Sequence, residues 1–110
     1  MAFEAYLSFS GTTATLHLGG DLMADDVTRL RALLDQLAAR TVGRVVLRLQ
    51  ELTSVTGGAV RALALGQQQL PPGAEVIVDG ASFPVRRALR FGGLEESMSL
   101  VDSSWPPAAG

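Results

Sequence analysis

The sequence predicts an α/β domain built on a mixed sheet of about five strands, with helices packed mainly on one face. Two observations support this prediction. The chain opens with two alternating apolar segments joined by a two-residue turn, a pattern typical of an antiparallel hairpin. Helical segments then alternate with short apolar segments, and repeated strand–helix units of this kind produce parallel strands.

The predicted hairpin comprises residues 5–10 and 13–18, with Gly11-Thr12 as the turn between them. One face of the second strand is apolar and carries Ala14, Leu16 and Leu18. His17 falls on the opposite, polar face, where we interpret it as an ordinary surface histidine. The pair Gly19-Gly20 is expected to break the second strand.

The first helix is predicted up to about Arg40, because apolar residues recur there at helical spacing. These residues are Val27, Leu30, Leu33, Leu34, Leu37 and Ala38. Asp25 and Asp26 precede them, at positions where carboxylates cap a helix and interact favourably with its dipole. We interpret both, together with nearby Asp21, as capping groups rather than as metal ligands.

The second strand–helix unit begins with residues 44–49, whose nearly continuous apolar character suits a central strand. A loop is expected over residues 50–56. The second helix follows, and its inward positions are Ala59, Val60, Leu63 and Ala64. The sequence Pro71-Pro72-Gly73 is expected to end this helix.

The last unit consists of a strand at residues 75–79, a third helix and a short strand at residues 97–101. Ser82 is expected to cap the third helix, which has Pro84 in its first turn and stops at Gly92-Gly93. Its outward face carries Arg86, Arg87 and Arg90. Overall, residues 1–102 are predicted to form a single domain, followed by a flexible tail at residues 103–110.

The composition excludes several classes of function. The 110 residues include no cysteine and one histidine, so disulfides, thiolate chemistry and histidine clusters are not available. A net charge of −2 argues against nucleic-acid binding, which normally requires a basic surface. We find no signal peptide, membrane-spanning run, catalytic triad, metal-ligand spacing or cofactor fingerprint. A cytoplasmic, non-enzymatic protein without metal or cofactor is therefore expected.

Four segments, in their order and spacing, resemble the STAS domain family of bacterial anti-sigma factor antagonists. Gly20-Asp21-Leu22 resembles the family's Gly-Glu-Leu-Asp sequence at the end of the second strand. Residues 45–49 and 52–55 resemble its central strand and switch loop. Residues 75–78 resemble its next strand, and residues 84–94 resemble its Pro-x-Val-x-x-x-Leu…Gly-Leu element. The resemblance covers most of the chain and implies the STAS fold.

In the family, the switch loop ends in Asp-Ser-Ser-Gly-Leu, and its first serine lies at a helix N-terminus. The bound partner, an anti-sigma factor with kinase activity, phosphorylates this serine, and the new charge evicts the partner. A gapless match places Gly57 at the acceptor position, between Thr56 and Gly58. Since glycine has no hydroxyl group, the resemblance implies a member that binds without this phospho-switch.

A second alignment shifts the loop by one residue and makes Thr56 the phospho-acceptor. Thr56-Gly57-Gly58 then resembles the Asp-Thr-Gly-Gly loop of STAS proteins attached to lipid-transport ABC ATPases. The helix pattern favours the gapless match, because the shift turns Arg61 toward the core and Leu63 away from it. In the gapless match Thr56 is expected to cap the second helix, and Gly57 and Gly58 to permit close approach of the loop.

The resemblance implies an interaction module that sequesters an anti-sigma factor or a related kinase-like protein. The family's interface implies these partner-binding residues: Asp21, Leu22, Ser54, Val55, Thr56, Gly57, Gly58 and Arg61. Two alternatives remain, a subunit that binds the ATPase of an ABC-type lipid transporter and a sensor of a small ligand. No nucleic acid and no membrane insertion are expected, and the edge of the hairpin offers a surface for a homodimer.

Overall fold

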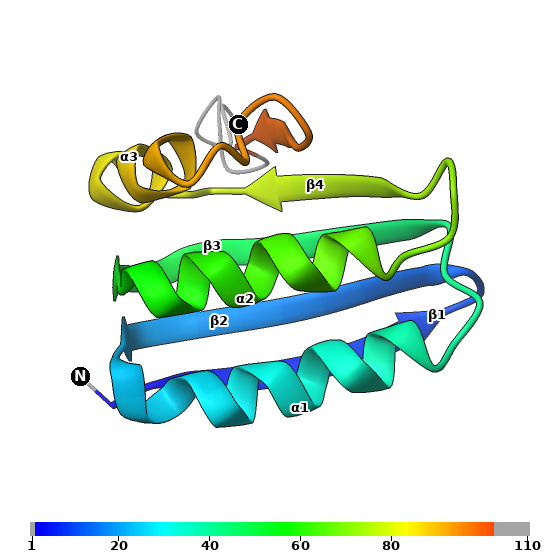
Figure 1. The fold of residues 1–110 in the computed structure, drawn as a ribbon, viewed down its shortest axis with the longest axis horizontal. Coiled ribbons are helices and arrows are strands. Elements are labelled where there is room, and N and C mark those ends of the chain that lie inside the picture. Colours follow the sequence, from blue (N-terminus) through cyan, green and yellow to red (C-terminus); the bar gives the residue numbers. More distant parts are fainter. Residues whose placement is uncertain (1, 103–110) are drawn as a thin grey trace, which may run out of the picture.

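The computed structural model describes residues 2–102, which form a five-stranded mixed sheet (Figure 1). The strands lie side by side in chain order: β1 (Glu4–Ser10), β2 (Thr13–Leu22), β3 (Arg44–Val55), β4 (Glu75–Asp79) and β5 (Ser99–Val101). β1 and β2 are antiparallel, and the three following pairs are parallel. The predicted α/β class and mixed sheet are confirmed, whereas the predicted tail at residues 103–110 lies outside the described residues.

The helices connect consecutive parallel strands: α1 (Val27–Ala38), α2 (Gly57–Gln68) and α3 (Phe83–Phe91), with a short 3-10 turn, η1 (Ala24–Asp26), before α1. The strand order advances in one direction, and strand–helix–strand crossovers are right-handed, so the helices gather mainly on one face. Figure 1 shows α1 and α2 lying across the sheet and α3 beyond the end of β4. Within the described residues, no helix combines the length and apolar character needed to span a membrane.

The hydrophobic core lies between the sheet and the helices. Ala14, Leu16 and Leu18 of β2 are completely buried, and Leu30 of α1 packs in the same cluster. Each fully buried leucine contributes about 1.5–3 kcal/mol relative to an exposed one. His17 lies on the opposite face of β2, partly exposed, with its Nε2 3.7 Å from a Glu51 carboxylate oxygen. The prediction of a surface histidine on a strand is therefore confirmed.

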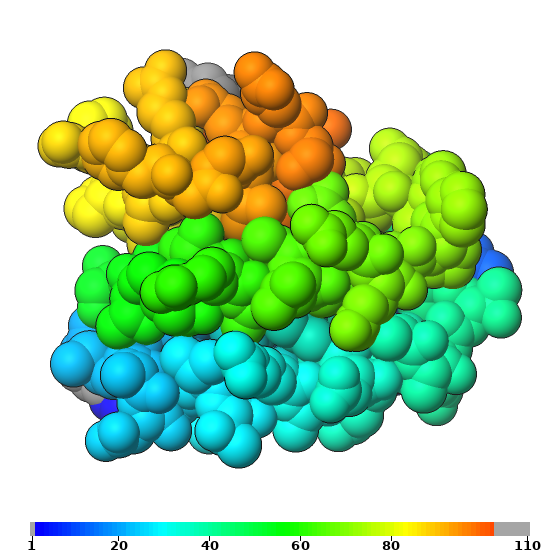
Figure 2. All heavy atoms as spheres, in the orientation of Figure 1, coloured from blue at the N-terminus to red at the C-terminus, as the bar shows by residue number. Residues whose placement is uncertain are grey.

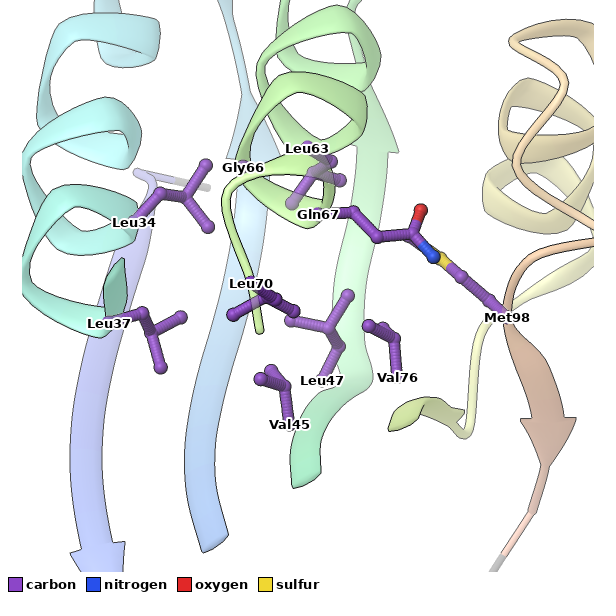
Figure 3. A pocket seen from close by; sticks show the side chains of 10 residues that line it. All are labelled: Leu34, Leu37, Val45, Leu47, Leu63, Gly66, Gln67, Leu70, Val76 and Met98. Carbon is purple, nitrogen blue, oxygen red and sulfur yellow. The ribbon is translucent and has the colours of Figure 1, made fainter. Parts of the chain in front are cut away.

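A small cavity remains in the core between α1, α2 and the sheet (Figure 3). It encloses about 20 Å³ and is lined mainly by leucine and valine side chains from α1, α2, β3 and β4. The Gln67 side chain at this cavity is held by Ser97, whose carbonyl oxygen accepts from Gln67 Nε2 at 2.9 Å. Ligand-binding pockets typically enclose about 300–1,000 Å³, so this cavity has no room for a small-molecule ligand.

Two strands are longer than the sequence predicts. Gly19-Gly20 does not break β2, which continues to Leu22, and the predicted loop at residues 50–56 is mostly part of β3. The register between the two strands shifts twice, and at each shift β3 has one more residue than β2. Such bulges interrupt the two-residue alternation that identifies a strand in a sequence, which explains why the predicted strands end too early.

Two helix starts differ from their predicted caps. The Asp26 carboxylate does not bond forward into α1 but accepts a hydrogen bond from the Met23 backbone N–H, at 3.0 Å. Ser82 occupies the cap position of α3, but its side chain makes no capping hydrogen bond. Pro84 lies in the first turn, as predicted. Ala38, predicted to face inward, is exposed at the C-terminal end of α1.

Candidate partner-binding site

The predicted partner-binding residues come from three segments that the fold brings together at one end of the sheet. The carboxyl ends of β2 and β3 are paired there, with Asp21 opposite Ser54 and Leu22 opposite Val55. The Thr56 backbone N–H donates to the Leu22 carbonyl oxygen at 3.1 Å, which places the start of α2 beside these strand ends. Leu22 itself is completely buried, so its side chain contributes to the core and not to a surface.

The other predicted residues are partly or fully exposed, and we call them the switch surface: Asp21, Ser54, Val55, Thr56, Gly57, Gly58 and Arg61. This arrangement depends on β2 and β3 being longer than predicted. Four residues of the switch surface lie at or just beyond the ends of these two strands. The structure thus brings together residues that are up to 40 positions apart in the sequence.

Asp21 fixes the end of β3 against β2. One of its carboxylate oxygens, Oδ1, accepts hydrogen bonds from Thr53 Oγ1 at 2.6 Å and from Ser54 Oγ at 2.8 Å. Hydrogen bonds to a charged acceptor are stronger than bonds between neutral groups. The interpretation of Asp21 as a capping group is therefore wrong, because its hydroxyl partners come from the neighbouring strand. The sequence pattern does not reveal this contact, because the pairing depends on the two register shifts.

Thr56 caps α2, as predicted. Its backbone is extended, and its Oγ1 accepts a hydrogen bond from the Ala59 backbone N–H at 3.3 Å. This bond pairs one of the N–H groups that a helix leaves without an internal partner in its first turn. Thr56 therefore determines where α2 begins and how Gly57 and Gly58 are presented.

Gly57 and Gly58 are not required by packing. A Cβ atom on Gly57 would meet no heavy atom within 4 Å, and one on Gly58 would lie 3.8 Å from Val27 Cγ2, an ordinary contact. Neither glycine has a positive φ. The prediction that these glycines permit a close approach of the loop is therefore wrong. Gly57 is exposed, and the backbone would accept a larger residue there.

The burial of α2 matches the gapless alignment. Arg61 is exposed, whereas Leu63 is 4% exposed and belongs to the core. The alternative alignment requires the opposite arrangement, in which an arginine faces the core and a leucine faces water. The assignment of Gly57 to the acceptor position remains a prediction, and the helix orientation is consistent with it.

A groove between α2 and α3 adjoins the switch surface, and nothing in the sequence pattern predicts it. This α2–α3 groove encloses about 340 Å³ and is lined by Gly57, Val60, Arg61, Ala64, Ala88, Phe91 and Gly92. The position of α3 against α2 is a tertiary feature with no periodic signal in the sequence. Within residues 2–102, no group of three or more His, Asp or Glu side chains is arranged to hold a metal ion.

Comparisons with known proteins relate this geometry to a family. A family model described as "Mlab, STAS domain" matches residues 6–102. No curated protein matches the sequence. The chain is similar in structure to an anti-sigma factor antagonist from Mycobacterium paratuberculosis, with a TM-score of 0.81 and 14% identity over 91% of this chain and 86% of that chain.

Two structures of a second protein are also similar. SpoIIAA in its unphosphorylated form has a TM-score of 0.75 and 21% identity, with coverage of 90% of this chain and 87% of that chain. The phosphorylated form of SpoIIAA, a Bacillus cell fate determinant, has a TM-score of 0.68 and 20% identity, with coverage of 90% of each chain. These similarities show that the fold is shared.

Proposed function

The chain belongs to the STAS domain family, and we propose that it is a non-enzymatic binding module similar to anti-sigma factor antagonists. It binds an anti-sigma factor in the cytoplasm and thereby controls transcription. The switch surface is the binding site. The observation that carries this proposal is the convergence of Asp21, Ser54 and the start of α2 on one exposed end of the sheet.

We further propose that phosphorylation at the acceptor position, to which Gly57 is assigned, does not reverse this binding. Gly57 has no hydroxyl group, although it lies exposed at the start of α2. The neighbouring hydroxyl groups already have structural partners: Thr56 Oγ1 accepts from the Ala59 N–H, and Ser54 Oγ donates to Asp21. Both hydroxyl groups thus have structural roles, and the acceptor position itself has no hydroxyl group to modify. We therefore propose a constitutive antagonist.

Two substitutions at Gly57 test the interface. Gly57→Glu introduces a bulky negative charge into open space, whereas Gly57→Ala adds only a methyl group at the same place. Calorimetric titration with a purified anti-sigma factor from the same genome should show binding weakened by roughly tenfold or more for Gly57→Glu. Gly57→Ala should bind within about twofold of the unchanged protein. Equal affinity of the two variants would show that the switch surface is not the interface.

A second candidate function is that of a subunit bound to the ATPase of an ABC-type lipid transporter. The observation that favours it is the Thr56-Gly57-Gly58 sequence at the start of α2. A pull-down that offers a purified anti-sigma factor and a purified transporter ATPase in equal amounts separates the two candidates. Retention of the anti-sigma factor supports the first proposal, and retention of the ATPase alone replaces it with the second.

A further inference from the structure

The α2–α3 groove adjoins the switch surface, and we infer that it docks an acidic, amphipathic helix of the same protein partner. This inference rests on the proposed function, because the groove shares Gly57 and Arg61 with the switch surface. A partner that covers these two residues also reaches the mouth of the groove. The groove would then form a second part of one continuous interface.

The shape of the groove follows from small residues where two helices meet. Ala64 of α2 and Ala88 of α3 line it, and Gly92 lies just beyond the end of α3. A Cβ on Gly92 would clash with Cγ1 of Val60, so the end of α3 lies directly against α2. Figure 2 shows the green atoms of α2 next to the yellow-orange atoms of α3, the two helices that supply most of the groove's lining. Its lining is mainly apolar, so it suits apolar side chains of a docked segment.

Phe91 forms one wall of the groove and is 78% exposed. The guanidinium carbon of Arg87 lies 5.6 Å from the centre of its ring. Exposed aromatic and arginine side chains are enriched in protein interfaces, and they often account for much of the binding energy. An exposed phenylalanine beside an apolar groove is therefore an anchor point for a partner rather than a requirement of the fold.

The positive charges around the groove favour an acidic partner segment. Arg61 lines the groove on α2, and Arg87 stands beside Phe91 on α3. Arg90 is bonded to Glu95 at 3.0 Å and is less available. No acidic side chain of residues 2–102 lines the groove. A helix that inserts an apolar anchor and flanks it with Asp or Glu matches both the lining and the charge.

Two phenylalanines of α3 provide a matched pair for the test. Phe91 lines the groove, whereas Phe83 is 71% exposed at the other end of the helix and does not line it. We expect Phe91→Ala to weaken binding of the anti-sigma factor by about tenfold or more, and Phe83→Ala to leave it within about twofold. Both side chains are largely exposed, so neither variant should fail to fold.

Two arginines provide the corresponding test of charge. Arg87 contacts Phe91, whereas Arg86 lines a separate hollow with Leu100 and Val101. Arg87→Glu should slow association with the anti-sigma factor, and the slowing should diminish as salt is added, while Arg86→Glu should have little effect.

The outcomes separate the two proposals. If Gly57→Glu weakens binding but Phe91→Ala does not, the groove is not a docking site and the proposed function stands. If Phe83→Ala weakens binding as much as Phe91→Ala, docking is not specific to the groove and the inference is wrong. If the unchanged protein does not bind the anti-sigma factor, the proposed function and this inference both fail.

Discussion

Gly57 and Gly92 both line the α2–α3 groove, but the space around their Cα atoms differs. A Cβ on Gly92 would clash with Val60, whereas a Cβ on Gly57 would meet nothing within 4 Å. Gly92 is therefore required for α3 to pack against α2. Gly57 has no such requirement, and its backbone accepts other residues. Two glycines that look alike in a sequence thus have different reasons to be there, and only Gly92 is explained by packing.

Substitution of Gly92, the glycine packed against Val60, should change stability most. Gly92→Ala should lower the free energy of unfolding by about 1–3 kcal/mol, because Val60 and the end of α3 must move apart. For a domain of this size each kcal/mol lowers Tm by about 4–8 °C, which a thermal melt detects. In a double-mutant cycle, Val60→Ala should offset part of the loss. Unchanged stability of Gly92→Ala would mean that the two helices do not meet as described.

Thr56→Ala tests how the start of α2 is held. Loss of the hydrogen bond between Thr56 Oγ1 and the Ala59 N–H should lower the free energy of unfolding by about 1 kcal/mol. Thr56→Ser keeps the acceptor oxygen and should retain most of the stability. Urea denaturation measures both variants. If the serine variant loses as much as the alanine variant, capping is not the source of the effect.

Asp21→Asn tests the contact that fixes the end of β3. The amide keeps the size of the side chain but accepts more weakly from the Thr53 and Ser54 hydroxyl groups. We expect faster amide hydrogen exchange over residues 52–56 with little change in Tm, since the altered contact is local. Asp25→Asn, on η1, is the matched control. Equal exchange rates in the two variants would contradict the assigned role of Asp21.

Substitution of Gly57, which has open space around it, should change stability least. Gly57→Ala should leave the free energy of unfolding unchanged or raise it by up to about 1 kcal/mol, because it restricts only the unfolded chain. Thermal melts run beside Gly92→Ala give the direct contrast. A clear destabilisation by Gly57→Ala would show that glycine is needed at this position for packing.

Much of the fold was predictable because its elements repeat regular patterns. Alternation in β2 identified Ala14, Leu16 and Leu18 as core residues, and helical spacing identified the inward face of α1. The ends of β2 and β3 were not predictable, because the register shifts remove the alternation. The Asp21–Ser54 contact depends on those same shifts and was missed for the same reason.

The candidate site was predictable only in part. A resemblance to the family indicated the switch residues, and the helix pattern correctly predicted an exposed Arg61 and a buried Leu63. The α2–α3 groove required knowledge of how α3 packs, and the clash that Gly92 avoids has no signature in the sequence. Leu22 was included because its neighbours matched the family motif, but its side chain is buried.

Binding without a phospho-switch is tested most directly by restoring a hydroxyl group at position 57. The unchanged protein and Gly57→Ser are each incubated with the purified anti-sigma factor and Mg-ATP, then examined by intact mass spectrometry and by gel filtration. We expect Gly57→Ser to gain one phosphoryl group and leave the complex, while the unchanged protein stays unmodified and bound. A phosphoryl group on the unchanged protein that maps to Thr56 would contradict it.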